Sequence, residues 1–244
     1  MNTSQELEQI PLRYAMVNTT IKAALAAANR PENAVKLVVV TKGQRVEKIQ
    51  SVIDSGATLL GENYPEETAS KIPELTRLEN ISWHMIGHIQ SRKIKFLVRY
   101  FDTIESVESL ETADKLNQKF AEARRRIRIM LEVNLSGETS KQGFDVDQRE
   151  KWPAFVNRVV QVARLESLEV CGLMTMPPLG DNAEASRKYF QQCRALGDFV
   201  NDHLGQTLIS ELSMGTSSDY PVAIEEGATI VRVGEAIMGP RIYA

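Results

Sequence analysis

The amino-acid sequence predicts an α/β fold, a single (β/α)8 TIM-type barrel with an extra N-terminal helix. Eight short apolar runs rich in β-branched residues alternate with segments of helical periodicity, which favours a closed barrel over a sandwich. The length of 244 residues is typical of one barrel domain. An open doubly wound sheet would place a glycine fingerprint after the first strand, and Lys42-Gly43-Gln44-Arg45 is not one. We therefore predict one domain over residues 1–244.

Residues 1–30 are predicted to form a helix that packs on the barrel. Ile10, Tyr14 and Val17 recur at spacings of four and three, which places them on one helical face. Pro11 interrupts an early turn, so the helix is expected to begin near Ile10. The repeat is short, which favours packing on the domain over a coiled-coil seam.

The predicted strands are continuous runs of Val, Ile and Leu, typical of strands buried on both faces of a parallel sheet. The clearest is the first, Leu37-Val38-Val39-Val40-Thr41. In chain order the eight strands are predicted at 37–41, 58–60, 81–86, 101–105, 127–135, 168–174, 208–214 and 229–233.

The segments between the strands carry apolar residues at helical spacing. In the first of them Val46, Ile49 and Ile53 share one face. Pro65 suits the first turn of the next helix, because that position needs no backbone N–H. Helices are predicted at 46–55, from near 65, and at 91–99, 108–125, 147–164, 183–204 and 220–226.

The composition is that of an ordinary globular protein and excludes several classes. Lysine and arginine total 29 against 32 for aspartate and glutamate, a net charge of −3, which offers no basic face for nucleic acid. No apolar run approaches the roughly 20 residues of a membrane span, and the N-terminus lacks the features of a secretory signal. Only Cys171 and Cys193 are present, so we expect no disulfide framework and a cytoplasmic protein. Neither nucleic acid nor a membrane is an expected partner.

The loops after the seventh and eighth strands are candidates for an anion site. In barrels, phosphate is often bound by these two loops and a short helix N-terminus. Here the segment 213–219 is rich in glycine and hydroxyl groups, and Gly234 precedes a helix-forming Glu235. Backbone N–H groups at both helix starts would favour an anion. Ser217 equally suits plain helix capping, so both interpretations stay open.

Lys42 stands at the carboxyl end of the most apolar strand in the chain. An ammonium there loses hydration, and a neutral amine can attack a carbonyl to form a Schiff base. The alternative is a structural salt bridge, for instance to Glu62 at the end of the second strand. A reactive lysine beside a phosphate site predicts a ligand with both a carbonyl and a phosphate. Pyridoxal 5′-phosphate (PLP) fits, and so does a phosphosugar held by an imine-forming aldolase.

The histidines and cysteines are weaker candidates for functional residues. His84 and His88 are four residues apart, but no carboxylate accompanies them, so no metal site is predicted. Cys171 and Cys193 fall within a strand and a helix, and we interpret both as core residues.

Seven motifs follow one another along the chain: Val40-Thr41-Lys42, Gly61-Glu62-Asn63-Tyr64, Trp83-His84-Met85-Ile86-Gly87, Asn134-Leu135-Ser136 with Ser140-Lys141-Gln142-Gly143, Gly172-Leu173-Met174, the segment 212–219, and Val231-Arg232-Val233-Gly234. Their residues and order resemble the pyridoxal phosphate homeostasis proteins, relatives of the barrel domain of alanine racemase. The resemblance covers about residues 37–241, nearly the whole chain.

The resemblance implies a role for each matched position. Lys42 would carry PLP as a Schiff base, Asn63 would lie beside the cofactor ring, and Arg232 would face the pyridine nitrogen. An arginine there, always charged, disfavours protonation of that nitrogen and weakens the ring as an electron sink. The other implied cofactor-binding residues are Ser217, Gly234 and Glu235 at the phosphate, and His84, Ser213 and Met214 in the rest of the pocket.

Four positions depart from the family pattern. Gln44 and Arg45 stand where the family often has a second lysine and a proline, Thr216 replaces a usual methionine, and Glu66 a usual glutamine. The change at Gln44 matters most, because a second lysine could assist cofactor transfer.

The expected function is PLP binding in intracellular PLP homeostasis, as a carrier or regulator without robust catalytic turnover and with no catalytic residue. The alternative is a PLP-dependent amino-acid racemase. In alanine racemases a tyrosine from an additional β domain serves the second face of the substrate, and this chain ends at Ala244, so we expect no such domain. The expected partners are PLP and PLP-dependent apo-enzymes, and the expected state is a monomer.

Overall fold

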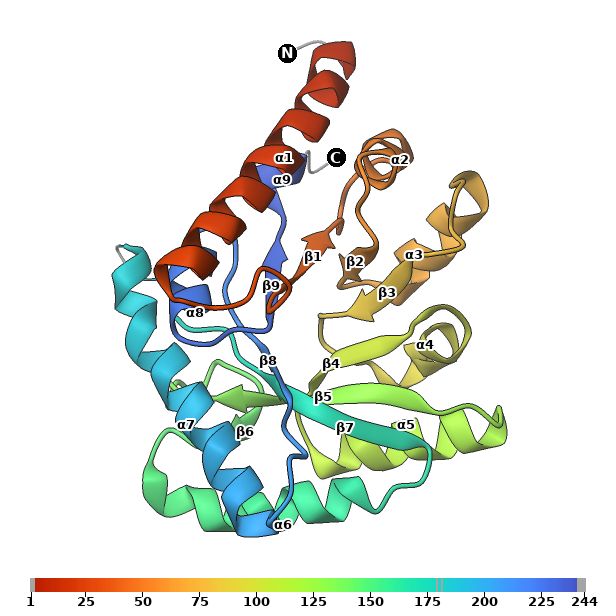
Figure 1. Ribbon diagram of the computed structural model, residues 1–244. Coiled ribbons are helices and arrows are strands. Elements are labelled where there is room, and N and C mark those ends of the chain that lie inside the picture. Colours follow the sequence, from red (N-terminus) through yellow and green to blue (C-terminus); the bar gives the residue numbers. More distant parts are fainter. Residues whose placement is uncertain (1–2, 179, 181, 241–244) are drawn as a thin grey trace.

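The computed structural model, which describes residues 3–178, 180 and 182–240, contains a closed barrel of eight parallel strands (Figure 1). Neighbouring strands pair in the order β4-β3-β2-β1-β9-β8-β7-β5, and a further pairing of β4 with β5 closes the ring. This confirms the predicted TIM-type barrel. Its strands are β1 (Lys36–Val40), β2 (Leu59–Glu62), β3 (Ser82–Met85), β4 (Thr103–Val107), β5 (Ile127–Asn134), β7 (Leu168–Met174), β8 (Glu211–Ser213) and β9 (Ile230–Val233).

Helices follow the strands and cover the outside of the barrel. Most of them turn an apolar face inward, as Leu116 and Phe120 of α5 illustrate, since both are fully buried. The helices are α2 (Val46–Asp54), α3 (Pro65–Lys71), α4 (Ile94–Tyr100), α5 (Leu110–Glu122), α6 (Trp152–Ala163), α7 (Arg187–Leu204), α8 (Tyr220–Glu225) and α9 (Glu235–Met238).

The N-terminal helix α1 (Thr3–Ala27) contacts α2, α8 and α9 along the outside of the barrel (Figure 1). The predicted start near Ile10 is wrong, because Pro11 lies inside the helix. A proline removes the N–H that would bind the carbonyl four residues earlier, and here the Ser51 hydroxyl donates to that carbonyl, of Leu7, at 3.4 Å. The replacement donor explains how the helix tolerates Pro11.

Three elements differ from the predicted strands, and the first is β4, which spans Thr103–Val107 where 101–105 was predicted. A two-residue strand, β6 (Phe144–Asp145), was not predicted and pairs with β5 alone, outside the ring. The strand predicted at 208–214 is shorter, because the Asn201 side chain binds the chain before it enters the sheet. Asn201 Oδ1 accepts from the N–H groups of Leu208 and Ile209, and Asn201 Nδ2 donates to the Ile209 carbonyl.

The barrel interior holds both apolar and polar side chains. Val38, Met130, Cys171, Met174 and Ile230 form a small buried apolar cluster. Buried polar side chains, described below, share the barrel with this cluster. Both cysteines are buried, as predicted, and burial raises the pKa of the Cys171 thiol to about 11.

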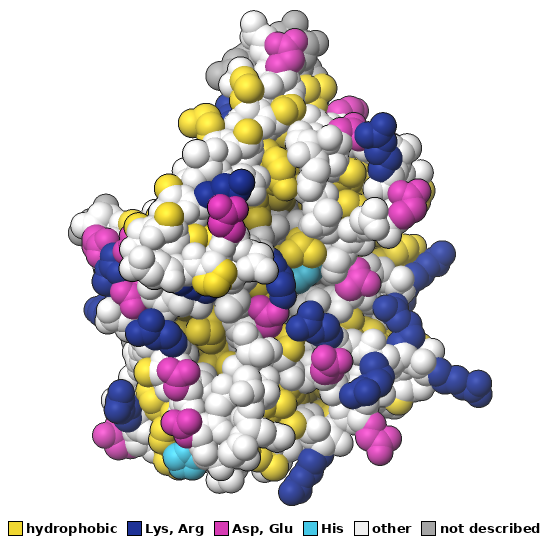
Figure 2. Space-filling view, in the orientation of Figure 1, with side chains coloured by type: hydrophobic (Ala, Val, Ile, Leu, Met, Phe, Trp, Pro, Cys, Tyr) yellow, Lys and Arg dark blue, Asp and Glu magenta, His cyan; other side chains and the backbone are white. Residues whose placement is uncertain are grey.

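The surface mixes both charge signs, and hydrophobic side chains gather along the outer part of α1 (Figure 2). Leu12 and Met16 are the most exposed of these, at 57% and 68%. Among the described helices, none has the length and apolar character needed to cross a bilayer.

Candidate functional site

Lys42 lies in a tight turn directly after β1. The Gln44 N–H donates to the Thr41 carbonyl at 3.1 Å, and Gly43 has a φ of +67°, the combination found in type II turns. Glycine suits that position because the left-handed region costs it nothing. The turn leaves Lys42 half-buried at the carboxyl end of the barrel.

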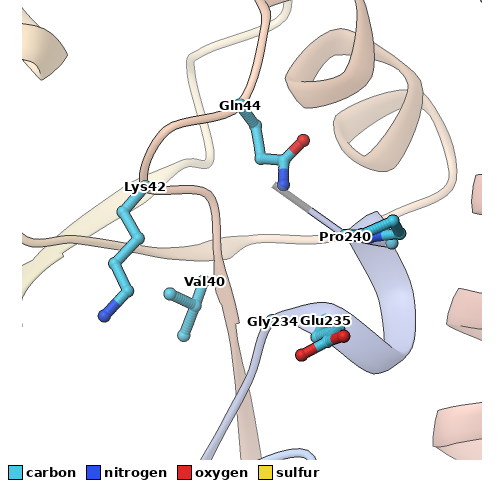
Figure 3. A pocket seen from close by; sticks show the side chains of 7 residues that line it. Val40, Lys42, Gln44, Gly234, Glu235 and Pro240 are labelled. Atoms are coloured by element: carbon cyan, nitrogen blue, oxygen red, sulfur yellow. The ribbon is translucent and has the colours of Figure 1, made fainter. Parts of the chain in front are cut away.

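A pocket of about 340 Å³ opens beside this turn. Figure 3 shows Lys42 extending along one side of Val40, with Gly234 and Glu235 on the other side. The two segments are in contact, since a Cβ added to Gly234 would lie 3.2 Å from Val40 Cβ. The structure therefore brings three predicted site residues, Lys42, Gly234 and Glu235, to one pocket. Its remaining lining residues are Val40, Gln44, Gly239 and Pro240.

The start of α9 faces the Ser217 side chain. Ser217 Oγ accepts hydrogen bonds from the N–H groups of Gly234, at 3.2 Å, and Ala236, at 3.3 Å. The loop can reach this position because Gly215 adopts a φ of +94°, and a Cβ there would lie 2.6 Å from Ala223 Cβ. The Ser217 oxygen thus caps the N–H groups of Gly234 and Ala236, and an anion at this position would have to replace it as their acceptor.

Four buried side chains form a hydrogen-bonded network inside the barrel. Arg232 donates to Ser213 Oγ at 2.5 Å and to the Thr175 carbonyl at 2.9 Å. Ser213 Oγ donates to Glu105 Oε2 at 2.5 Å, and His84 Nδ1 lies 2.6 Å from Glu105 Oε1. The network joins three predicted site residues, His84, Ser213 and Arg232, through a carboxylate that was not predicted.

The charges of this network support one another. Burial opposes ionisation of Glu105, but the hydrogen bond from His84 and the charges of His84 and Arg232 outweigh it and hold its pKa below the ordinary value. A carboxylate only accepts, so the proton of this hydrogen bond is on His84 Nδ1. Burial lowers the pKa of Arg232, and Glu105 is the first of the carboxylates that oppose this effect. The guanidinium stays charged.

Asn63 and Met214 differ in what they can offer a ligand. Asn63 follows β2, and its Oδ1 is buried without a hydrogen-bond partner in the described part of the chain. Buried acceptors are rarely left without a donor, so this atom suits a ligand that supplies one. The Met214 side chain is fully buried in the hydrophobic core, and its N–H donates to the Ile230 carbonyl. Met214 therefore packs in the core beneath the site.

Glu105 is the main residue that the sequence reasoning missed. The predicted strand 101–105 ends on it, so a charged residue at the end of a buried strand was visible by the criterion that singled out Lys42. The alternative salt-bridge partner, Glu62, accepts from Thr41 Oγ1 at 2.8 Å and from Lys71 Nζ at 3.4 Å. In the ranges 3–178, 180 and 182–240, no three His, Cys, Asp or Glu side chains gather to hold a metal ion.

The burial of Glu62 leads us to expect that the stability of the protein depends on pH. Burial raises its pKa from 4.5 to about 7, with Lys71 and Thr41 opposing the shift. The folded state therefore binds a proton at Glu62 more tightly than the unfolded state does. The resulting contribution to the free energy of unfolding is complete below the ordinary pKa of glutamate and is lost as the pH rises through about 7. In Glu62→Gln, the fall in unfolding free energy between about pH 5 and about pH 8 should shrink by about 2 kcal/mol.

Urea titrations of both proteins across that range measure the effect. The slope should not vanish entirely in the variant, because burial and Glu108 also raise the pKa of Glu132 to about 7. An unchanged slope would show that Glu62 does not take up a proton on folding.

Two comparisons with known proteins bear on this site. Residues 20–241 match the family described as alanine racemase, N-terminal domain. The pyridoxal phosphate homeostasis protein of Pasteurella multocida is 33% identical over 96% of this chain and 99% of its own length. That of Pseudomonas aeruginosa is 35% identical over 97% and 98%. This chain belongs to the pyridoxal phosphate homeostasis protein family.

Solved structures agree with that membership. PipY of Synechococcus elongatus without PLP aligns with a TM-score of 0.81 and 32% identity, over 95% of this chain and all of that one. PipY with PLP bound aligns with a TM-score of 0.77 over 90% of this chain. Alanine racemase from Clostridium difficile, at 17% identity and a TM-score of 0.67, shares the fold and is covered over 56% of its length.

Within this family of homeostasis proteins, the present chain carries Gln44 in the wall of the Lys42 pocket. Gln44 is buried, and in Figure 3 its amide points toward Pro240, away from the Lys42 side chain. The neighbouring Arg45 lies 3.4 Å from Glu6 of α1. Gln44 and Arg45 thus occupy the side of the turn that faces α1 and α9.

Proposed function

We propose that this protein binds PLP through a Schiff base to Lys42 and acts in intracellular PLP homeostasis without robust catalytic turnover. The observation that carries the proposal is the pocket that Lys42 shares with Gly234 and Glu235. Family membership supports it, since the curated relatives are named pyridoxal phosphate homeostasis proteins and PipY has a structure with PLP bound.

The residues present fit the cofactor. Ser217, Gly234 and the start of α9 would hold the phosphate, which would replace the Ser217 oxygen as acceptor from the Gly234 and Ala236 N–H groups while the Ser217 hydroxyl turns to donate to it. Glu235 begins that helix and lines the same pocket. The buried Oδ1 of Asn63, which has no hydrogen-bond partner among the described residues, would accept a hydrogen bond from the cofactor. PLP supplies the aldehyde that condenses with the Lys42 amine.

The buried network would serve the ring. Arg232 would face the pyridine nitrogen, held by Ser213 and the Thr175 carbonyl, with His84 attached through Glu105. A charged guanidinium beside the nitrogen disfavours its protonation, which weakens the electron withdrawal that racemisation requires. Met214 would support this layer from the core. This arrangement favours a carrier over the alternative, a PLP-dependent amino-acid racemase.

The proposed setting follows from the same features. We infer one barrel domain over 1–244, acting as a monomer in the cytoplasm, where the two buried thiols stay reduced. The proposed partners are PLP and PLP-dependent apo-enzymes, to which the cofactor would be delivered.

Lys42→Ala tests the attachment. The wild type, loaded with PLP, should show a visible imine absorbance and a borohydride-stable mass increase on the peptide that contains Lys42. The variant should lose both, because no amine remains at that position. Lys36→Ala is the matched control, since Lys36 lies at the opposite end of β1 and pairs with Glu211, and it should behave as the wild type.

An imine band that survives Lys42→Ala unchanged would refute the attachment. Trapping by borohydride only after addition of a sugar phosphate would favour the aldolase instead. Release of the α-deuteron from labelled alanine, well above the rate with free PLP, would favour the racemase.

A further inference from the structure

Glu67 and Lys71 of α3 and Glu62 at the end of β2 form a triad of ionisable side chains beside the Lys42 turn. Lys71 Nζ lies 2.7 Å from Glu67 Oε1, one helical turn earlier, and 3.4 Å from Glu62 Oε1 at the end of β2. The Lys71 side chain is 9% exposed and that of Glu62 fully buried, whereas Glu67 is 27% exposed. Because buried charges must keep their partners, the positions of these three side chains are strongly coupled.

The triad binds both peptide groups that flank the Lys42 Cα. Lys71 Nζ lies 3.5 Å from the Thr41 carbonyl, which belongs to the peptide group before Lys42. The Gly43 N–H, in the peptide group after Lys42, donates to the two oxygens of Glu67 at 3.2 Å and 3.4 Å. Peptide groups are planar, so the orientation of the first sets φ of Lys42 and that of the second sets ψ. Together they fix the direction of the Lys42 Cα–Cβ bond.

The strand side of the turn is held as well. The Thr41 N–H donates to the Gly61 carbonyl at 2.9 Å, and Thr41 Oγ1 donates to Glu62 Oε1 at 2.8 Å. The carboxyl end of β1 is therefore fixed, and the remaining freedom lies in the peptide group between Lys42 and Gly43. Glycine readily changes its φ, so this peptide group would rotate if Glu67 did not accept its N–H.

We propose that Glu67 and Lys71 are positioning residues that direct the Lys42 side chain into its pocket. The inference rests on the proposed attachment of PLP to Lys42 and assigns the residues that make this lysine ready for it. The lysine side chain is flexible, so the direction of its Cα–Cβ bond decides where the amine can reach. Each additional backbone conformation at Lys42 lowers the fraction of molecules whose amine lies in the pocket.

Hydrogen exchange of the ligand-free protein tests the contact itself. Glu67→Ala removes the acceptor, so the Gly43 amide should exchange about tenfold faster. Glu67→Gln keeps an amide oxygen that can accept the same N–H and should restore most of the protection. Lys93→Met is the matched control, because Lys93 pairs with the adjacent Glu66 on the same helix, and it should leave Gly43 unchanged.

Two measurements on Lys42 test the consequence. The acetylation rate of Lys42 relative to Lys36, followed by peptide mass spectrometry without ligand, should change by a few-fold in Glu67→Ala and less in Glu67→Gln. The Kd for PLP should rise about tenfold in Glu67→Ala and stay within about threefold in Glu67→Gln, as expected for a hydrogen bond to a charged acceptor. Lys71→Met should act in the same direction as Glu67→Ala.

The outcomes separate this inference from the proposed function. A wild-type protein that forms no PLP adduct, while Glu67→Ala still changes Gly43 exchange and Lys42 acetylation, would support the positioning role and overturn PLP attachment. Normal Gly43 exchange, Lys42 acetylation and PLP affinity in Glu67→Ala would overturn the positioning role. A loss in Glu67→Ala that Glu67→Gln fails to restore would overturn the hydrogen-bond explanation.

Discussion

Glu105→Ala should lower the free energy of unfolding by about 4 kcal/mol, because it leaves a buried charge without its partner. Glu105 is fully buried and accepts from His84 and Ser213, and Arg232 lies 4.0 Å away with 3% of its side chain exposed. Without the carboxylate, the guanidinium keeps its desolvation cost and loses its counter-charge. Denaturant unfolding at neutral pH measures the effect.

Glu169→Ala is the control for Glu105. Glu169 is half-exposed on the barrel strand β7, with its Oε1 3.8 Å from Arg128 Nε, and a surface pair of this kind contributes little. The free energy of unfolding at acid pH gives a second test. Because the folded pKa of Glu105 is lowered, its contribution is present above the ordinary value and is lost as the pH falls through the folded one. Glu105→Ala should lack that acid-dependent loss, and a destabilisation below about 1 kcal/mol would contradict the network.

Gly87→Ala is expected to lower the free energy of unfolding by about 3 kcal/mol and to weaken PLP binding about tenfold. A Cβ at Gly87 would lie 2.6 Å from Asn63 Cα and 2.7 Å from the Asn63 carbonyl oxygen, so backbone must move. Gly87 cannot retreat easily, since its carbonyl accepts from the buried Ser106 hydroxyl at 2.6 Å. The displacement therefore falls on Asn63, which we propose lies beside the cofactor ring.

Gly197→Ala separates this effect from the general cost of changing a buried glycine. Gly197 lies in α7, where a Cβ would meet side-chain atoms rather than backbone: a methyl of Ile209 at 3.2 Å and one of Leu212 at 3.5 Å. Alanine also favours the helix, so the change in stability should stay within about 1 kcal/mol and PLP affinity should not change. Equal losses of PLP affinity in both variants would contradict a specific role for the contact between Gly87 and Asn63.

The barrel itself was predictable because its signals are local. The β-branched run that ends at Thr41 and the helical period of Val46, Ile49 and Ile53 each report on their own segment. The start of α1 was predicted wrongly because it depends on a residue that is distant in sequence. Pro11 is a local helix breaker, and the Ser51 hydroxyl that compensates for it comes from α2, 44 residues away in sequence from the Leu7 carbonyl that it binds.

Part of the candidate site was predictable by the same logic. Lys42 and Gly234 both follow barrel strands, and the closure of a parallel barrel brings such positions to one rim. The resemblance of the motifs to a known family supplied His84, Ser213 and Arg232, but no pattern in the chain connected them. Glu105 connects them in space, and its partner Ser213 lies 108 residues further along the sequence.

By itself, then, the sequence determined the order of strands and helices, the strand ends where chemistry collects, and the lysine that stands among them. Only the tertiary structure decided which charges pair inside the barrel and which side chains hold the Lys42 turn. The physical reason is that periodicity and turn preference act over a few residues, whereas Glu105 meets Arg232 and Lys71 meets the Thr41 carbonyl only after the sheet has closed and α3 has packed against it.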